Sequence, residues 1–226
     1  MNVARLMGTS WLVHDGKRGI IVDAARRGQA EAIKKRIEPL GLTIPLLFLT
    51  HTHFDHAGCA ATLQTYTGAK VIVGAAEADG LQQGYTPVPK GTFVVTRVIS
   101  DAGHKLTPKQ TEYYDAVTQD IIPIDTARDL SEFGFDAQVL PLGGHTAGSI
   151  GLHMGDYIFS GDTVFGVGGV LYPPFADYPD EIPAAWEKIL DTGAKYICPG
   201  HGRMLSRDRL EKQHQARYGN RYKIIL

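Results

Sequence analysis

The sequence has few cysteines and little net charge, and these two absences exclude several classes of protein. Its 226 residues include only two cysteines, Cys59 and Cys198, which is too few for a disulfide scaffold or a Cys-rich structural zinc site. We expect both to be buried free thiols. The formal net charge is -1, so no overall field favours nucleic acid or an anionic membrane.

Long hydrophobic stretches are also missing. No apolar segment approaches the length of a membrane span, and the N-terminus has no uninterrupted apolar core after a basic start, as a secretory signal would. We therefore expect a cytoplasmic protein that binds neither a membrane nor nucleic acid. The basic segment 207–223 is interpreted as a solvated terminal helix, with a nucleic-acid patch as the alternative.

What the sequence does contain is a dense cluster of potential metal ligands. The apolar run Leu46–Leu49 predicts a buried strand, and it leads directly into His51, His53, Asp55 and His56. Alternation places the first two imidazoles on one side of an extended backbone, whereas the last two ligands fall in the turn that opens the next helix. Four ligands so arranged crowd a single ion, so the cluster favours two neighbouring metals.

Three further candidate ligands each follow an apolar run. His145 follows the run at 137–142, Asp162 follows the run at 157–160, and His201 follows the run at 195–199. Each run predicts a strand, and each ligand comes after one or more small residues. We expect the strand ends of both halves of the chain to meet, which would bring all the ligands together at one edge of the fold.

These motifs resemble those of the metallo-β-lactamase-fold superfamily, from about Val3 to about Leu205. In order, they are Ile-Ile-Val-Asp23, the cluster at 51–56, Gly-His145-Thr, Gly-Asp162-Thr and Gly-His201-Gly. The resemblance implies an α/β fold, the four-layer αββα sandwich, with two mixed sheets face to face and helices outside. We expect a single domain over 1–226, with an insertion or flap at about 75–135.

The same resemblance implies a role for each ligand. His51, His53 and His145 would hold the first metal, Asp55, His56 and His201 would hold the second, and Asp162 would bridge them. Asp23 and Thr50 are expected to support the ligand loop without binding metal themselves; a turn or cap carboxylate is the alternative for Asp23.

The local patterns predict most of the secondary structure. Strands are expected at 3–6, 10–14, 19–22, 69–73 and 150–153, besides the ligand-bearing runs, with helices at 28–38, 57–66 and 183–190. Within the insertion, 92–99 is β-rich, and 107–110 resembles the start of a short helix carrying Tyr113, Tyr114 and Val117. Part of the insertion would cover the site; surface packing or a homodimer contact is the alternative.

The donor set indicates the chemistry. Imidazole and carboxylate ligands without thiolate suit zinc, and would also accept iron or manganese, so we expect two Zn²⁺ ions. Two such ions share a water, lower its pKa and polarise the bond that it attacks, which predicts hydrolysis by a bridging hydroxide. Asp55 and Asp162 are the candidate catalytic residues, since Asp55 could orient the hydroxide's proton. The alternatives are a structural staple and a metal-binding module without turnover.

The branch that the sequence resembles most is the glyoxalase II-like thioester hydrolases, through segments 50–58, 144–149 and 159–165. Two departures separate it from glyoxalase II: 25 residues follow His201 in this sequence, so we expect no C-terminal helical domain, and Gly169-Val170 stands where that family often has Gly-Arg. We expect hydrolysis of a small-molecule ester, thioester or lactone. The alternatives are a mononuclear iron enzyme like the persulfide dioxygenases, and a lactonase, in which Tyr usually stands where Phe165 lies.

Candidate substrate-binding residues come from the loop after Asp162 and from the insertion. Tyr172, Phe175 and Tyr85 could line an apolar pocket, and Pro173-Pro174 would stiffen that loop. An aromatic wall suits an acyl chain, a lactone or a thioester equally well.

Overall fold

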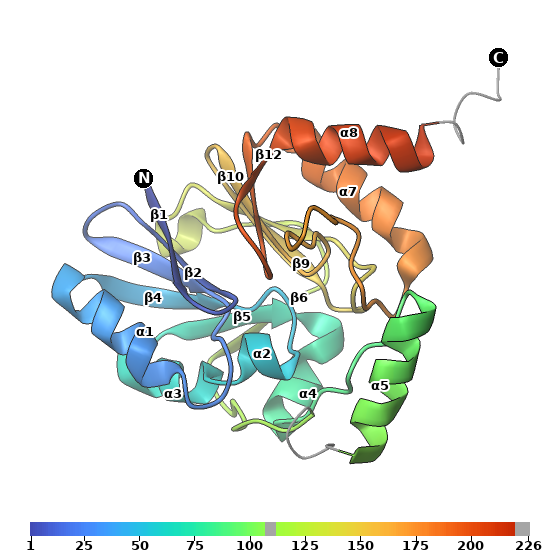
Figure 1. The fold of residues 1–226 in the computed structure, drawn as a ribbon. Coiled ribbons are helices and arrows are strands. Elements are labelled where there is room, and N and C mark those ends of the chain that lie inside the picture. The colour runs from blue at the N-terminus through green and yellow to red at the C-terminus, as the bar shows by residue number, and fades with distance from the viewer. Residues whose placement is uncertain (107–111, 220–226) are drawn as a thin grey trace.

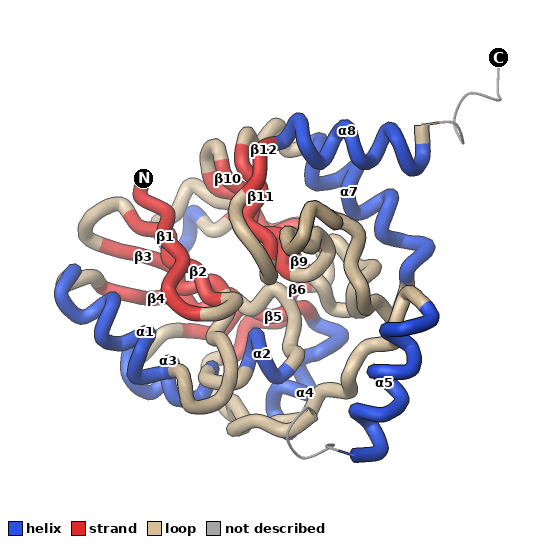
Figure 2. The backbone as a smooth tube through the Cα atoms, in the orientation of Figure 1, coloured by secondary structure: helices blue, strands red, loops and turns tan. Residues whose placement is uncertain are grey.

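The computed structural model describes residues 1–106 and 112–219, which form two six-stranded sheets with helices on the outer faces (Figure 1). In Figure 2 the strands lie in the interior and the helices lie outside them. This is the four-layer α/β sandwich that the motifs predict. No described helix is long and apolar enough to cross a membrane.

The first sheet is built from the N-terminal half of the chain in sequential order. Its first three strands are antiparallel, and the remaining three continue parallel to the third. Asp15 forms the hairpin turn between the second and third strands, because its Oδ1 accepts the N–H groups of Lys17 and Arg18 at 2.8 Å. The strands are β1 (Asn2–Met7), β2 (Ser10–His14), β3 (Arg18–Val22), β4 (Thr43–Phe48), β5 (Lys70–Gly74) and β6 (Ile121–Ile124).

The second sheet is built from the C-terminal half. It is antiparallel except for one parallel pair, β10 with β11. In spatial order its strands are β12 (Leu205–Ser206), β11 (Tyr196–Pro199), β10 (Tyr157–Gly161), β9 (Ile150–Met154), β8 (Gln138–Pro141) and β7 (Arg128–Asp129).

Three buried apolar clusters separate the four layers. Phe48 and Phe159 belong to the middle cluster, between the sheets. Ile33 and Leu63 anchor α1 (Ala30–Ile37) and α3 (Ala60–Thr67) on the first sheet, and Trp186 and Leu210 belong to the cluster under α7 (Ile182–Asp191) and α8 (Arg207–Tyr218). The short 3-10 turns lie at Glu38–Leu40, Ala75–Glu77, Ser131–Phe133 and Pro179–Glu181.

The predicted helix at 57–66 is two helices. α2 (Phe54–Ala57) contains two of the ligands, and α3 begins at Ala60. Gly58 lies between them, where a Cβ would overlap the Arg27 nitrogen and the Phe54 oxygen and lie 2.8 Å from the Ala25 oxygen. The break therefore allows the ligand loop to pack closely against the loop that follows β3.

The segment between β5 and β6 contains the largest difference from prediction. Residues 92–99 are not a strand; residues 94–99 form the first half of α5 (Val94–Leu106), which follows α4 (Ala78–Gln83). Thr96 fixes the start of α5, since its Oγ1 accepts the Phe93 N–H and donates to the Phe93 oxygen at 3.0 Å. No sheet edge pairs with this segment among the described residues, so the β-branched side chains are accommodated in an amphipathic helix. Val94 is 77% and Val98 65% exposed.

The helix expected after 107–110 is also absent from the described part of the chain. Residues 107–110 themselves lie outside the described residues. Tyr113 pairs with Tyr85 in an isolated bridge, with ring centroids 5.0 Å apart, and Tyr114 is buried, with its hydroxyl 2.8 Å from Thr86 Oγ1. These contacts hold the segment in extended conformation against the end of α4.

Candidate metal centre

The seven predicted ligands lie on loops and one short helix at the same edge of the sandwich. His51 and His53 follow β4, and Asp55 and His56 lie in α2, at the end of the first sheet's parallel portion. The remaining three come from the second sheet, on the loops after β8, β10 and β11: His145, Asp162 and His201. Three overlapping groups of these residues have candidate ligand atoms within 4.8 Å of one another.

The first group is His51, His53 and His145. His145 Nε2 lies 3.2 Å from His51 Nε2 and 3.0 Å from His53 Nδ1, so three ring nitrogens point at a common centre. All three side chains are buried. Burial, reinforced by neighbouring imidazoles, lowers the pKa of His51 and His53 well below the usual value, and burial also lowers the pKa of His145. The group is therefore neutral, as metal-binding imidazoles must be.

The second group is Asp55, His56 and His201. His201 Nε2 lies 3.0 Å from Asp55 Oδ2. Burial alone would raise the pKa of Asp55, but His56 and His201 outweigh it and lower the value to about 2. Burial would lower the pKa of His56, but the carboxylates of Asp23, Asp162 and Asp55 raise it well above its usual value.

Asp162 faces both groups. Its Oδ1 lies 3.4 Å from His56 Nε2, and its Oδ2 lies 3.4 Å from His201 Nε2 and 3.9 Å from His145 Nε2. Burial opposes its ionisation, but the surrounding histidines lower its pKa far below the ordinary range. Oδ1 therefore faces the second group, and Oδ2 lies between the second group and His145 of the first.

Asp23 and Thr50 hold the ligand loop from behind. Asp23 Oδ1 accepts the Thr50 N–H at 2.8 Å, and its Oδ2 lies 2.8 Å from His56 Nδ1. Thr50 Oγ1 lies 2.9 Å from Asp23 Oδ2 and 3.1 Å from His51 Nδ1. With the outer ring nitrogens fixed in this way, the inner nitrogens of His51 and His56 face the site. Asp23 is 1% exposed and has a φ of 60°, a strained value for a residue other than glycine.

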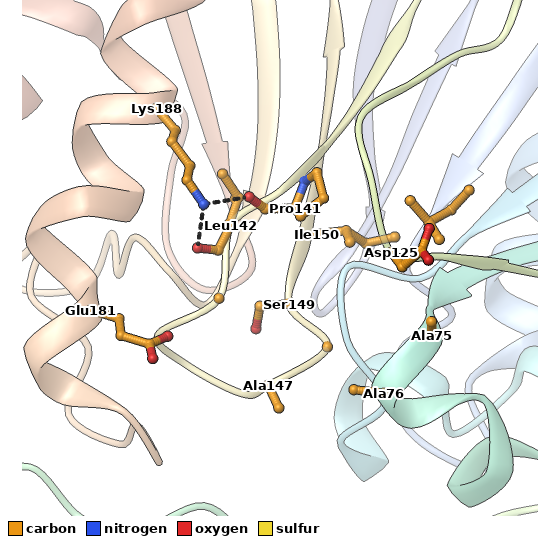
Figure 3. Close-up of a pocket in the computed structure, with 13 residues that line it drawn as sticks. Ala75, Ala76, Asp125, Pro141, Leu142, Ala147, Ser149, Ile150, Glu181 and Lys188 are labelled. Carbon is orange, nitrogen blue, oxygen red and sulfur yellow. Dashed lines mark hydrogen bonds between the residues drawn. The ribbon is translucent and has the colours of Figure 1, made fainter.

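The loop that carries His145 is fixed by two neighbouring elements. His145 Nδ1 lies 2.8 Å from the Phe175 oxygen, which orients the ring. On the other side of the loop is a cavity of about 310 Å³, where Lys188 of α7 donates to the Pro141 and Leu142 oxygens at 2.8 and 3.4 Å (Figure 3). These bonds attach α7 to the end of β8 and to Leu142, on the segment that leads to His145.

The donor atoms fit divalent metal ions. His56 Nε2 and Asp162 Oδ1 are buried and have no hydrogen-bond partner among the described residues, which is costly unless another group binds them. Gly200 leaves room beside both: a Cβ there would overlap Asp162 Oδ1 and lie 2.6 Å from His56 Cε1. Imidazoles combined with carboxylates are a ligand set for zinc, iron or manganese.

A cavity of about 340 Å³ opens directly onto the centre. It reaches Asp55, His145, Asp162 and His201, and its other walls are mostly apolar. The insertion contributes to it, as does the loop after β10. The residues that complete the lining are Arg26, Phe54, Val88, Ile99, Ser100, Gly103, Phe165, Pro173, Pro174 and Phe175.

Of the three aromatic residues expected in this cavity, the structure places only Phe175 in its lining. Tyr172 is 8% exposed and packs beside Trp186 with ring centroids 6.4 Å apart, because its side chain points into the core under α7. Tyr85 packs on Tyr113. Neither residue lines the cavity. The structure therefore does not place Tyr172 and Tyr85 in the predicted substrate pocket.

Sequence reasoning missed Glu77, a buried carboxyl beneath the ligand loop. Its Oε2 accepts the Thr52 N–H, between the first two ligands, at 2.9 Å. Burial raises the pKa of Glu77, opposed by hydrogen bonds from Thr146 and Thr52. An isolated glutamate after β5 carries no motif, so only the folded contacts reveal that it supports both the His51–His53 segment and the residue after His145.

Comparison with known proteins agrees with this geometry. A family model of the metallo-beta-lactamase superfamily matches residues 3–201. The chain is 31% identical over 193 residues to the hydroxyacylglutathione hydrolase GloC of Haemophilus influenzae, covering 83% of this chain and 82% of that protein. It is 27% identical over 207 residues to a hydroxyacylglutathione hydrolase of Albidiferax ferrireducens, covering 87% of this chain but only 62% of that longer protein.

A solved structure shares the fold at lower identity. An archaeal metallo-beta-lactamase superfamily protein from Sulfolobus tokodaii superposes with a TM-score of 0.69 at 18% identity, over 92% of this chain and 78% of that one. Fold, site and relatives together define a metal-dependent hydrolase. The chain belongs to the metallo-β-lactamase superfamily, whose family model covers nearly its whole length.

Proposed function

We propose that this protein hydrolyses a small-molecule thioester, ester or lactone at a dinuclear centre, and that thioesters are its principal substrates. The position of Asp162 carries the proposal, because its carboxylate faces both ligand groups: Oδ1 faces His56, and Oδ2 faces both His201 and His145. A mononuclear site of two histidines and one carboxylate would leave several of the seven candidate ligands without a role. The names of the two relatives favour thioesters within the ester class.

The chain would divide the work between its two ligand groups. His51, His53 and His145 would hold one ion, and Asp55, His56 and His201 the other, with two zinc ions expected and iron or manganese accepted. Ions bound in this way would supply a hydroxide nucleophile at neutral pH and polarise the scissile carbonyl.

Asp55 and Asp162 would be the catalytic carboxylates. Asp162 would connect the two ligand groups, since its carboxylate faces His145 of the first and His56 and His201 of the second. Asp55 Oδ2, beside His201, would accept a hydrogen bond from the attacking water and orient its proton. The second ligand group would face the leaving group, while the apolar walls formed by Phe165 and Phe175 exclude bulk water from the reacting bond.

The lactone alternative receives no support from position 165. Phe165 lines the cavity with its ring centroid 5.5 Å from that of His201, and it has no hydroxyl to donate to a ring oxygen.

A single domain, a cytoplasmic location and a homodimer remain predictions. The exposed apolar side chains of α5 are the part of the insertion that a second copy would contact.

The test is a substrate panel on the purified protein as it folds with its metals. Rates would be measured for a hydroxyacylglutathione, a simple acyl thioester, an aryl ester and a lactone, before and after chelation and after zinc is restored. We expect thioester turnover that chelation abolishes and zinc restores, and that Asp162→Ala lacks. Turnover that survives chelation, or oxygen uptake with a persulfide by an iron-containing preparation, would contradict the proposal.

A further inference from the structure

The cavity over the metal centre has one charged side chain without an expected role. Apart from the ligands, Arg26 is the only ionisable side chain among the described residues that line it, and the others are apolar or neutral. Its neighbour Arg27 is paired with Asp115 at 2.6 Å. The Arg26 guanidinium has no carboxylate partner among the described residues, although it lies at the mouth of a cavity that leads to the metal centre.

The backbone of Arg26 is held firmly while the guanidinium stays exposed. The Arg26 N–H donates to Gln29 Oε1 at 3.2 Å, and its oxygen accepts from Cys59 Sγ at 2.8 Å and from the Gln29 N–H at 3.1 Å. The preceding residue, Ala25, has a φ of 56°. Residues other than glycine hold such values only where the surroundings impose them, often at functional sites.

The side chain is also directed toward the second ligand group. The Arg26 guanidinium carbon lies 5.4 Å from the centroid of the Phe54 ring, close enough for a cation–π contact. Phe54 directly precedes Asp55, and both line the cavity. A planar guanidinium that rests on an aromatic ring needs little reordering to bind a carboxylate with two parallel hydrogen bonds.

We propose that Arg26 binds a carboxylate of the substrate at the mouth of this cavity, on the leaving-group side. The substrate would then be a compact thioester whose reacting part is apolar and whose thiol portion carries the negative charge. The volume of the cavity supports a compact substrate, since about 340 Å³ is near the lower end for small-molecule sites. The inference rests on the proposed thioester hydrolysis and adds a specificity-determining residue to it.

A matched pair of substrates tests this directly. S-acetyl-3-mercaptopropionate and its carboxamide have nearly the same size and differ in charge, so the ratio of their kcat/KM values measures carboxylate recognition. We expect the wild-type protein to prefer the carboxylate. Arg26→Gln should lower the ratio about tenfold, mainly through KM, as the loss of an exposed charge-assisted contact predicts.

Two further variants separate geometry from charge. Arg26→Lys should keep only part of the preference, since an ammonium lacks the planar pair of donors. Arg27→Gln, which removes the adjacent and already paired cation, should keep the full ratio. Melting temperature and metal content of each variant would be measured alongside, so that damage to the fold is recognised.

The outcomes distinguish this inference from the function on which it rests. If the wild-type protein cleaves both substrates but Arg26→Gln leaves their ratio unchanged, Arg26 is not the carboxylate site and the hydrolytic function stands. A wild-type ratio near one would also overturn the assignment. If neither thioester is cleaved by the metal-loaded protein, the proposed function itself fails, and the inference fails with it.

Discussion

Replacing Asp23 with asparagine should separate support of the metal centre from ligation. The carboxylate accepts from the Thr50 N–H and from His56 Nδ1, both at 2.8 Å. An asparagine offers one oxygen, so either orientation of its amide turns an NH₂ group toward a buried donor. Loss of one charge-assisted bond and the donor left unsatisfied together cost about 2–4 kcal/mol in the free energy of unfolding of the metal-free protein. Losing the partner of a metal-binding histidine should also weaken metal affinity about 10–100-fold.

The assay is urea unfolding of the metal-free Asp23→Asn protein, followed by metal titration. Asp156→Asn is the matched control, because Asp156 pairs with Lys195 at 3.2 Å on the surface, where such pairs contribute about 0–1 kcal/mol. The affinity loss should fall on the ion held by His56. A variant as stable as the control, with both metal affinities intact, would refute the supporting role of Asp23.

Two further predictions follow from buried contacts beside the ligands. Gly200→Ala should displace Asp162 and His56, and so lower metal stoichiometry and kcat; unchanged metal content would contradict the fit of the site. Burial raises the pKa of Glu77 above the ordinary value of about 4.5. As the pH rises from that value, the carboxyl group of the unfolded state loses its proton before that of the folded state. The free energy of unfolding therefore declines over this window. The metal-free Glu77→Gln variant should lose less stability than the wild-type protein over that window, which urea unfolding at several pH values would measure. Equal slopes of unfolding free energy against pH for the two proteins would contradict this.

The sequence predicts the layers well because their causes are local. The apolar runs before His51, His145 and Asp162 have no long alternating pattern, which is typical of buried strands, and each ends in small residues and a ligand. Such patterns and turn chemistry, together with the order of the motifs, were sufficient for the ligand-bearing strands of both sheets and for the helices at 28–38 and 183–190.

The segment between β5 and β6 was harder to predict for a physical reason. Val94, Val95, Val98 and Ile99 favour a strand by propensity, but a strand needs a neighbour, and helix formation here depends on which sheet edges remain open. The short strands β6, β7 and β12 were missed for the same reason, since two to four residues give no period and only pairing defines them.

The lining of the cavity depends on packing between distant segments. Tyr172 was an equally good candidate to Phe175 by residue type, and only the core under α7 determines that its ring points away from the site. Arg26 carries no motif that distinguishes it from Arg27; the difference is that Arg27 reaches Asp115 and Arg26 reaches the cavity.

The measurement that tests the dinuclear centre most directly is metal content per chain, by plasma mass spectrometry on protein purified without added metal. The geometry of the two ligand groups around Asp162 predicts about two ions per chain, zinc or a two-metal mixture. About one iron per chain with little zinc, unchanged after incubation with excess zinc, would contradict the dinuclear account and favour the mononuclear iron alternative.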